Sequence, residues 1–195
     1  MKLVIIDYGA GNIKSIQFAF ARLGMETSLS SNIETILAAD KVIFPGVGEA
    51  SSAMKMLRNH DLHDLIPNLK QPVLGICLGM QLLCQHTEEG NTVGLGIFQT
   101  KVKRFAMDKH IKVPQIGWNT IENVKSDLFK DIPDQAFMYL VHSYYAEMCP
   151  ETIATTTYGT SYASALQHNN FYGVQFHPEK SGDIGSKILA NFLEL

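Results

Sequence analysis

The stretch 72-PVLGICLGMQLL-83 changes its pattern halfway along. Residues 72–76 form a continuous apolar run, which is typical of a strand covered on both faces of a parallel sheet. Residues 78–85 are rich in Leu, Met and Gln, which favour a helix. The two segments are joined at Cys77, which has a glycine two residues before it and another two residues after it. A strand that turns directly into a helix is the building unit of α/β folds, so this stretch predicts that class.

The first half of the chain repeats this alternation of strand and helix. Apolar, β-branched runs predict strands at residues 2–6, 27–30 and 41–44. Apolar residues at helical spacing predict helices at about 13–23 and around 53–57. Such alternation predicts an open, mainly parallel central sheet with helices on both faces.

The second half, after Gly90, contains more strand-like segments. They are residues 101–105, 137–145, 152–158, 162–167 and 171–176. The chain closes with a predicted helix that has Ser181 as its N-cap and an apolar face made of Ile184, Ile188, Leu189 and Phe192. No internal repeat or long linker interrupts the sequence. We therefore expect a mixed sheet with a β-rich second half, within one α/β domain over residues 1–195.

The composition is that of a globular protein. The chain has 195 residues, of which 46% are hydrophobic and 18% are charged, and its formal net charge is -3. This charge suggests neither a nucleic-acid partner nor a membrane surface. The N-terminal segment reaches an acid, Asp7, after a run of apolar residues that is too short for a signal sequence or a membrane span.

The cysteines point to a reducing compartment. Cys77, Cys84 and Cys149 are odd in number and widely spaced, which argues against a disulfide framework. We therefore expect a cytoplasmic protein. Cys84 is expected to pack within the helix that follows Cys77, and Cys149 to lie in a loop.

Two glycine turns follow predicted strands. The first, Gly9-Ala10-Gly11, has only part of the G-x-G-x-x-G dinucleotide fingerprint, because Lys14 occupies the third glycine position. We expect a structural or partner-facing turn there, and no cofactor. The second, Pro45-Gly46-Val47-Gly48, lies at the carboxyl end of a strand, where ligands of open α/β sheets bind. It is either an ordinary turn or a segment whose backbone amides approach a substrate.

Gly75-Ile76-Cys77-Leu78-Gly79 has the layout of a nucleophile elbow, in which flanking glycines relieve crowding around a raised nucleophile. A helix that begins at about Leu78 would favour a thiolate over a thiol at Cys77. The backbone amide of Leu78 would then be placed to stabilise an oxyanion. Taken alone, Cys77 is also compatible with a core position, because free cysteines are often buried.

A base for this cysteine is predicted near the end of the chain. His177 and Glu179 are two residues apart, at the end of the predicted strand 171–176. In extended backbone this spacing puts both side chains on one face, so the carboxylate can orient the imidazole. Pro178 between them favours the extended form. The elbow and this pair together favour a thiol mechanism over simple packing.

The remaining histidines show no spacing with cysteines or acids that is typical of a metal site. They are His60, His63, His86, His110, His142 and His168. We therefore expect no bound metal.

With both motifs present, the chain resembles the class I glutamine amidotransferases. The motifs are GICLGMQ at 75–81 and GVQFHPE at 173–179. Further segments resemble the family of glutaminase subunits of imidazole glycerol phosphate synthase, an enzyme of histidine biosynthesis. They are DYGAGN at 7–12, FPGVGEA at 44–50, PQIGWN at 114–119 and VHSYY at 141–145. The resemblance covers essentially the whole chain.

This resemblance implies a role for each matching residue. Cys77 would attack the side-chain amide of L-glutamine, His177 would act as base and then protonate the leaving ammonia, and Glu179 would hold His177. The resulting glutamyl thioester would be hydrolysed by water. Backbone amides would stabilise the oxyanion at Leu78, Gly46 and Val47. The glutamine-binding residues would be Gly48, Gln81, His142, Ser143 and Tyr144.

The resemblance also implies a partner, a (βα)₈ cyclase subunit that receives the ammonia and forms a heterodimer with this chain. That subunit would make imidazole glycerol phosphate and an aminoimidazole carboxamide ribotide. Asn12, Trp118 and Lys180 match interface positions, although Trp118 is equally compatible with a core position. The chain departs from the family pattern at Gln115, where histidine is usual, and near Thr100, where a glycine is expected. These departures concern the interface more than the reaction.

Three other interpretations remain open. The chain could be the glutaminase subunit of another synthase, such as pyridoxal phosphate synthase, but DYGAGN, PGVG and PQIGWN argue against it. It could be a cysteine hydrolase or peptidase of the same fold, for which the HPE motif is not expected. It could be a catalytically silent regulatory or scaffolding module, which an intact Cys77, His177 and Glu179 speak against.

Overall fold

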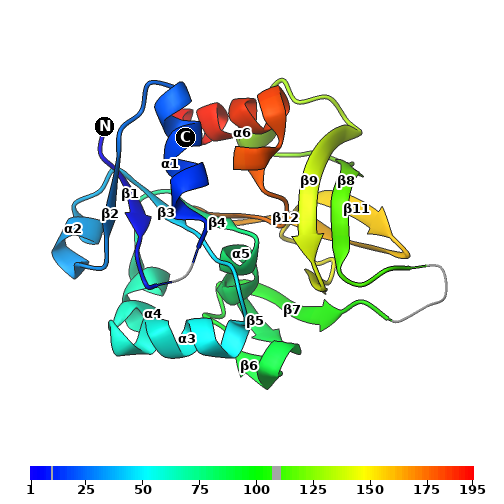
Figure 1. The fold of residues 1–195 in the computed structure, drawn as a ribbon, viewed down its shortest axis with the longest axis horizontal. Helices are drawn as coiled ribbons and strands as arrows, with labels where there is room; N and C mark the ends of the chain where they lie inside the picture. The colour runs from blue at the N-terminus through cyan, green and yellow to red at the C-terminus, as the bar shows by residue number, and fades with distance from the viewer. Residues whose placement is uncertain (10, 107–110) are drawn as a thin grey trace.

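A large mixed sheet runs through the molecule (Figure 1). The computed structural model describes residues 1–9, 11–106 and 111–195, so Ala10 and His110 lie outside the described residues. The strand order of this sheet is β2-β1-β3-β4-β13-β12-β10-β7-β5-β6, with β11 paired to β12.

The first half of the sheet is parallel. Each neighbouring pair from β2 to β13 runs in the same direction. The strands are β1 (Leu3–Ile6), β2 (Thr27–Ser30), β3 (Lys41–Phe44), β4 (Val73–Ile76) and β13 (Phe171–Val174). All except β2, at the edge, are buried along their whole length, as expected for strands covered on both faces.

The second half of the sheet is mainly antiparallel, with β5 and β7 as its parallel pair. Its strands are β5 (Cys84–Thr87), β6 (Thr92–Val93), β7 (Phe98–Arg104), β10 (Tyr144–Ala146), β11 (Thr152–Tyr158) and β12 (Thr160–His168). A separate antiparallel pair is formed by β8 (Gln115–Ile121) and β9 (Ala136–His142). We call this pair the β8–β9 hairpin.

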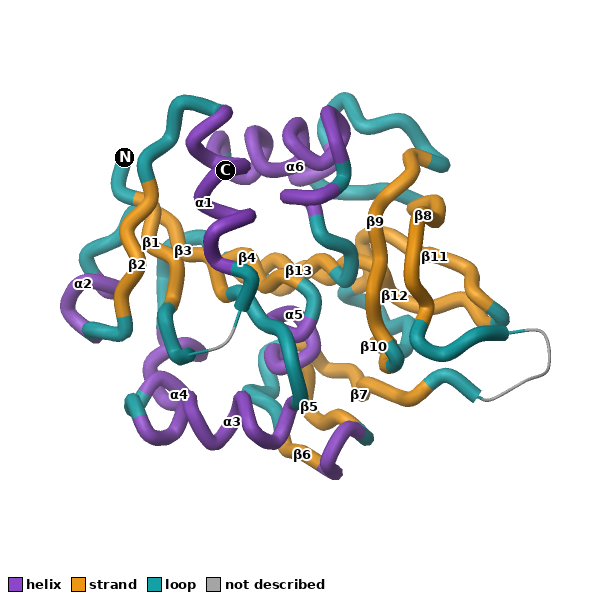
Figure 2. The backbone as a smooth tube through the Cα atoms, viewed as in Figure 1, coloured by secondary structure: helices purple, strands orange, loops and turns teal. Residues whose placement is uncertain are grey.

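Helices cover both faces of the parallel half (Figure 2). One face carries α1 (Ile13–Arg22) and α6 (Gly182–Glu194), and the other carries α3 (Ala50–Asn59), α4 (Leu62–Leu65) and α5 (Leu78–Leu83). A short helix, α2 (Ile33–Leu37), connects β2 to β3. Short 3₁₀ turns lie at Ile66–Asn68, Glu89–Asn91, Asp127–Phe129 and Pro178–Lys180.

Alternate residues of the strands contribute to two separate cores. In β1, Val4 packs into the core under α3 and α4, whereas Ile5 packs with Phe20 of α1 and Phe192 of α6. This two-sided burial follows from the period of two in extended backbone. The prediction of a mixed, mainly parallel sheet with helices on both faces is thus confirmed.

Some predicted boundaries are wrong. The predicted strand 137–145 is two strands, because β9 pairs with β8 while β10 pairs with β7 and β12, and the chain changes sheet at Ser143. The predicted helix 78–85 ends at Leu83, because Cys84 begins β5 and pairs with Phe98. Ser181 does precede α6, but its hydroxyl donates to the carbonyl of His177 instead of capping the helix. In the described residues, no helix has the length and apolar character needed to cross a bilayer.

Candidate active site

Cys77 lies in a sharp turn between β4 and α5. Its backbone angles are φ 54° and ψ -112°, a conformation that non-glycine residues adopt rarely and that is typical of functional sites. The turn presses α5 against the end of β3, so that a Cβ on Gly79 would collide with the carbonyl oxygen of Phe44. Glycine at this position is therefore required by close backbone approach, as the elbow motif predicts.

His177 and Glu179 lie beside Cys77, after the end of β13. The predicted strand 171–176 is too long, because β13 ends at Val174 and Glu179 belongs to a 3₁₀ turn. The expectation that extended backbone brings the two side chains together is thus wrong. They are nevertheless paired, since the His177 Nδ1 and a Glu179 carboxylate oxygen are 2.8 Å apart and both side chains are buried.

The electrostatics of this group favour a charged imidazole. Burial opposes a charge on His177, yet its pKa is raised to about 10, because hydrogen bonds to Cys77 and Glu179 and the negative charges of both outweigh the burial. Tyr8 also faces the thiol, and its pKa is raised by burial and then by the charge of Cys77. The arrangement therefore favours an imidazolium at His177, beside Cys77.

A cavity of about 310 Å³ opens in front of the thiol. The structure brings to its wall the residues that the sequence analysis connected with catalysis and glutamine: Val47, Gly48, Cys77, Leu78, Gln81, His142, Ser143, Tyr144 and His177. Two predicted residues lie behind the wall. Gly46 packs against Leu78 and Gly79, and Glu179 lies behind the imidazole of His177.

The sequence analysis missed other residues on the cavity wall, namely Glu89, Pro114 and Val141. Glu89 is the only acid among the described residues that line the cavity. Its carboxylate accepts a hydrogen bond of 3.0 Å from the amide of Ala50, and burial raises its pKa. Its sequence context, an acidic pair before Gly90, is typical of an exposed turn, so no local signal could have identified it.

Tyr8 was also missed, although it lies within the DYGAGN motif. Its hydroxyl donates a buried hydrogen bond of 2.8 Å to the carbonyl of Pro45. Because the peptide unit is planar, this bond also sets the direction of the N–H of Gly46. Tyr8 thus orients the first peptide of the segment predicted to supply oxyanion amides.

His142 also lines the cavity. Its Nδ1 lies 2.7 Å from the carbonyl oxygen of Tyr144, which can only accept, so Nδ1 must carry a proton. Its Nε2 lies 3.3 Å from the hydroxyl of Tyr162, which donates at 3.0 Å to Gln115. Burial and, to a smaller extent, the neighbouring charge of His177 together lower the pKa of His142 to about 4, although the bond to Tyr144 raises it. The side chain is therefore neutral at physiological pH.

The neutral state of His142 predicts a loss of stability in acid. A histidine whose folded pKa lies below its unfolded value near 6.5 binds its proton more tightly in the unfolded chain. The contribution of His142 to the free energy of unfolding, about 3 kcal/mol, is complete above pH 6.5 and is lost as the pH falls toward 4. The free energy of unfolding of the wild type and of His142→Gln should be measured by urea denaturation across this window.

We expect the pH slope of His142→Gln to be shallower than that of the wild type. The exposed His60 offers the matched control, and His60→Gln should keep the wild-type slope. Equal slopes for the wild type and His142→Gln would show that His142 is not held neutral.

The residues that match interface positions lie outside the cavity. Trp118 is 56% exposed on the β8–β9 hairpin, so a core position for it is wrong. Its ring packs edge-on against the ring of Tyr139, with 6.1 Å between the two ring centres, and the Nζ of Lys180 lies 5.8 Å from the centre of the Tyr139 ring. Asn12 directly precedes α1.

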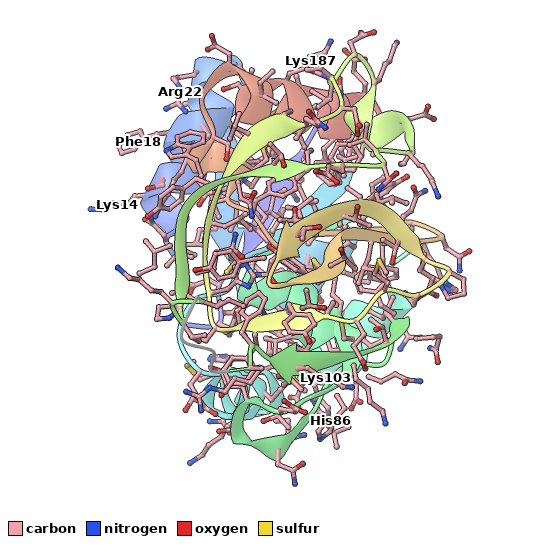
Figure 3. The ribbon with its side chains drawn as sticks, turned by 90° about the vertical axis from the view of Figure 1, so that its right-hand side faces the viewer. Lys14, Phe18, Arg22, His86, Lys103 and Lys187 are labelled. Atoms are coloured by element: carbon pink, nitrogen blue, oxygen red, sulfur yellow. The ribbon has the colours of Figure 1, made fainter. Side chains whose placement is uncertain are left out.

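The hairpin exposes further apolar side chains beside Trp118. Ile116 is 64% exposed and Phe137 is 61% exposed. On α1, Lys14, Phe18 and Arg22 are exposed and project away from the sheet (Figure 3). Exposed apolar side chains that cluster on one hairpin are typical of a contact surface.

The sequence matches one family over nearly its whole length. The family Glutamine amidotransferase class-I matches residues 4–195. The chain is 55% identical to the imidazole glycerol phosphate synthase subunit HisH of Bacteroides fragilis, over all of both chains. It is 47% identical to the subunit of the same name from Escherichia coli K12, again over all of both chains.

Solved structures share the fold at low sequence identity. A crystal structure of a glutamine amidotransferase superposes with a TM-score of 0.76 at 18% identity, covering 98% of this chain and 97% of the other. The structure of PurLQS from Thermotoga maritima superposes with a TM-score of 0.76 at 14% identity, covering 99% of this chain and 97% of that one. The chain therefore belongs to the class I glutamine amidotransferase family and, within it, to the HisH subunits of imidazole glycerol phosphate synthase.

Proposed function

We propose that this chain hydrolyses the side-chain amide of L-glutamine through a Cys77 thioester and delivers the ammonia to a cyclase subunit. The observation that carries the proposal is the buried pair of His177 and Glu179 beside a strained Cys77, at the wall of a cavity. Nucleophile, base and orienting carboxylate together are the requirement of covalent acyl transfer.

The first half of the reaction forms the thioester. The Cys77 thiolate attacks the δ-carbonyl carbon of glutamine, and the electron pair of the C=O bond moves to the oxygen. Amides of Leu78, Gly46 and Val47 stabilise this oxyanion. When it collapses, the C–N bond breaks and the leaving nitrogen takes the proton of His177, so ammonia departs and His177 becomes neutral.

The second half regenerates the enzyme. A water molecule attacks the thioester carbonyl carbon while His177 takes one of its protons. The tetrahedral species then collapses, the C–S bond breaks, and the sulfur leaves with the bonding electrons as a thiolate. The γ-carboxylic acid formed in this step loses its proton to solvent and leaves as glutamate, while Cys77 and His177 are again thiolate and imidazolium. Glu179 keeps the imidazole oriented through both halves.

Glutamine recognition follows from the polar groups of the wall. Glu89 is suited to the α-ammonium group of glutamine, because one of its oxygens binds the amide of Ala50 and the other can face the ligand. The Gln81 Nε2 donates to two acceptors within the protein, Gln175 Oε1 and the carbonyl of Tyr144. Gln81 can therefore offer glutamine only its carbonyl oxygen.

The proposed partner is the (βα)₈ cyclase subunit of imidazole glycerol phosphate synthase, in a heterodimer. The HisH relatives carry the name of a subunit of that enzyme. The exposed Trp118 with Lys180 and Tyr139 is the docking surface that we propose, since aromatic anchors are common at interfaces. The cyclase would incorporate the ammonia into imidazole glycerol phosphate and an aminoimidazole carboxamide ribotide. We propose that both subunits work in the cytoplasm.

The test is release of glutamate and ammonia from glutamine by the purified chain, alone and with the cyclase subunit and its ribotide ligand. We expect turnover to rise by about a hundredfold or more with the liganded partner, because the free energy of partner binding can be used to align the catalytic groups. Turnover that the partner does not change would assign the chain to another synthase. Absence of turnover under all conditions would contradict the glutaminase itself.

The docking surface is tested in the same assay. Trp118→Glu should abolish the activation by the cyclase while leaving the low turnover of the isolated chain unchanged. Val93 is 65% exposed on β6, at the far edge of the sheet, so Val93→Glu is the matched control and should be activated normally. Normal activation of Trp118→Glu would place the interface elsewhere.

A further inference from the structure

A chain of buried hydrogen bonds links Gln81 and Tyr144 on the cavity wall, through Gln175, to the sulfur of Cys77. The Nε2 of Gln175 donates to the Cys77 sulfur at 3.7 Å. The Oε1 of Gln175 accepts a bond of 2.8 Å from Gln81 Nε2, which also donates to the carbonyl of Tyr144 at 2.9 Å. Gln175 is fully buried and Gln81 is 4% exposed, so water does not compete for these groups.

The carbonyl of Tyr144 decides the orientation of both amides. A carbonyl oxygen can only accept, so Gln81 must turn its NH₂ group toward Tyr144. The second hydrogen of that group then reaches Gln175, whose oxygen must face it. This leaves the NH₂ group of Gln175 facing the sulfur of Cys77. The reverse orientation of the Gln175 amide would bring two NH₂ groups together, which cannot hydrogen-bond to each other.

The backbone keeps Gln175 in this place. Its amide donates to the carbonyl of Ser164 at 2.9 Å, just beyond the end of β13. Gln175 is two residues before His177, and the two side chains approach Cys77 independently of each other. The sulfur thus has a neutral donor in addition to the imidazole.

We propose that Gln175 is a further catalytic residue, whose side-chain N–H stabilises the negative charge on the Cys77 sulfur, an inference that rests on the proposed glutaminase reaction. The sulfur is anionic at two points of that reaction, before attack on glutamine and when the C–S bond of the thioester breaks. A donor at the sulfur favours the thiolate at both points. Gln81 takes part as a positioning residue, because it fixes which end of the Gln175 amide meets the sulfur.

A packing role alone makes a different prediction. If Gln175 only fills space, methionine at this position fits a similar volume and leaves the reactivity of Cys77 unchanged. If the N–H stabilises the thiolate, its loss should lower reactivity about tenfold or more, the usual effect of a hydrogen bond to a charged group.

The test compares the alkylation of Cys77 by iodoacetamide in the wild type and in Gln175→Met, using the full-length chain between pH 5 and 9. Peptide mass spectrometry separates Cys77 from Cys84 and Cys149. The matched control is Gln167→Met, because the amide of Gln167 bonds to Tyr172 and lies outside the cavity. The titratable groups that face the sulfur, His177 and Tyr8, with Glu179 behind His177, are the same in all three proteins.

We expect the alkylation of Cys77 at pH 7 to be about tenfold slower in Gln175→Met, and the whole rate curve to move to higher pH. Glutaminase kcat/KM with the cyclase subunit should fall by a similar factor. Gln167→Met should match the wild type in both measurements. An unchanged alkylation curve in a folded Gln175→Met would overturn the proposal, even where turnover falls.

A measurement on the wild type covers the case in which Gln175→Met does not fold. In ¹⁵N-labelled protein, the side-chain amide signal of Gln175 should shift with pH at the midpoint of the alkylation curve, and this shift should vanish in Cys77→Ala. A signal that does not respond would also overturn the proposal. Alkylation of Cys77 does not require glutamine turnover. An absence of turnover would therefore contradict the proposed glutaminase, whereas an unchanged alkylation curve would contradict the role of Gln175.

Discussion

Cys77→Ala is expected to lower glutamine hydrolysis by at least about 10⁴-fold, because none of the other described residues on the cavity wall is a cysteine that could form the thioester. Alanine keeps the Cβ and the turn, so the backbone at φ 54° is no more strained than with cysteine. The variant should therefore fold, bind the cyclase subunit and support cyclisation when ammonia is supplied directly. Glutamate release and ammonia-dependent product formation, measured on the same preparation, check the loss of hydrolysis and the retained cyclisation.

The control for this variant is Cys149→Ala. Cys149 is a partly buried free cysteine on the wall of a different pocket, and its loss should leave glutamine turnover intact. Retained glutaminase in Cys77→Ala would contradict the thioester mechanism. Loss of partner binding together with turnover would show that Cys77 is needed for folding instead.

Glu179→Gln is expected to lower kcat by about 10²- to 10⁴-fold with a much smaller change in KM. Glutamine keeps the shape of the side chain and can still accept from His177 Nδ1, so the geometry at 2.8 Å survives. What disappears is the negative charge that helps to hold the imidazolium. The pKa of His177, about 10 in the wild type, should therefore fall, which NMR titration of the imidazole measures.

The same change alters stability at alkaline pH. A histidine with a raised folded pKa contributes stability that is complete below its unfolded pKa near 6.5 and is lost as the pH rises through about 10. In Glu179→Gln this contribution to the free energy of unfolding should be lost at lower pH than in the wild type.

Glu151 provides the matched control for activity. It pairs with His168 at 2.7 Å, away from the cavity, so Glu151→Gln should keep full glutaminase activity. A normal kcat in Glu179→Gln would remove Glu179 from the mechanism.

Local pattern predicted several strands to the residue. Residues 27–30, 41–44 and 152–158 were predicted as strands, and β2, β3 and β11 have those bounds. Their signals are local, because side-chain period and flanking turn residues both lie within a few positions. Patterns of this kind fail where the chain leaves one neighbouring strand for another while the alternation of its side chains continues unchanged. Residues 137–145 read as one strand for that reason, although Ser143 separates β9 from β10.

Some residues of the candidate site have a local signal in the sequence, and others do not. Cys77, with its flanking glycines, carries a local signal, because a strand-to-helix turn needs small residues around the nucleophile. Glu179 was paired with His177 for an incorrect reason, since a 3₁₀ turn and not a strand brings them together. Glu89 had no local signal, and it reaches the cavity through a bond to Ala50, far from it in the sequence.

By itself, the sequence determined the fold class and the elbow at Cys77, and it predicted His177 as the base, because each of these depends on residues close together in the chain. Only the tertiary structure decided how the thiol is surrounded. Gln175 meets Cys77 across 98 positions and Gln81 across 94, so neither contact leaves a periodic or local trace in the sequence. The physical reason is that a buried amide is oriented by whichever donors and acceptors the packed sheet brings to it, here the carbonyl of Tyr144.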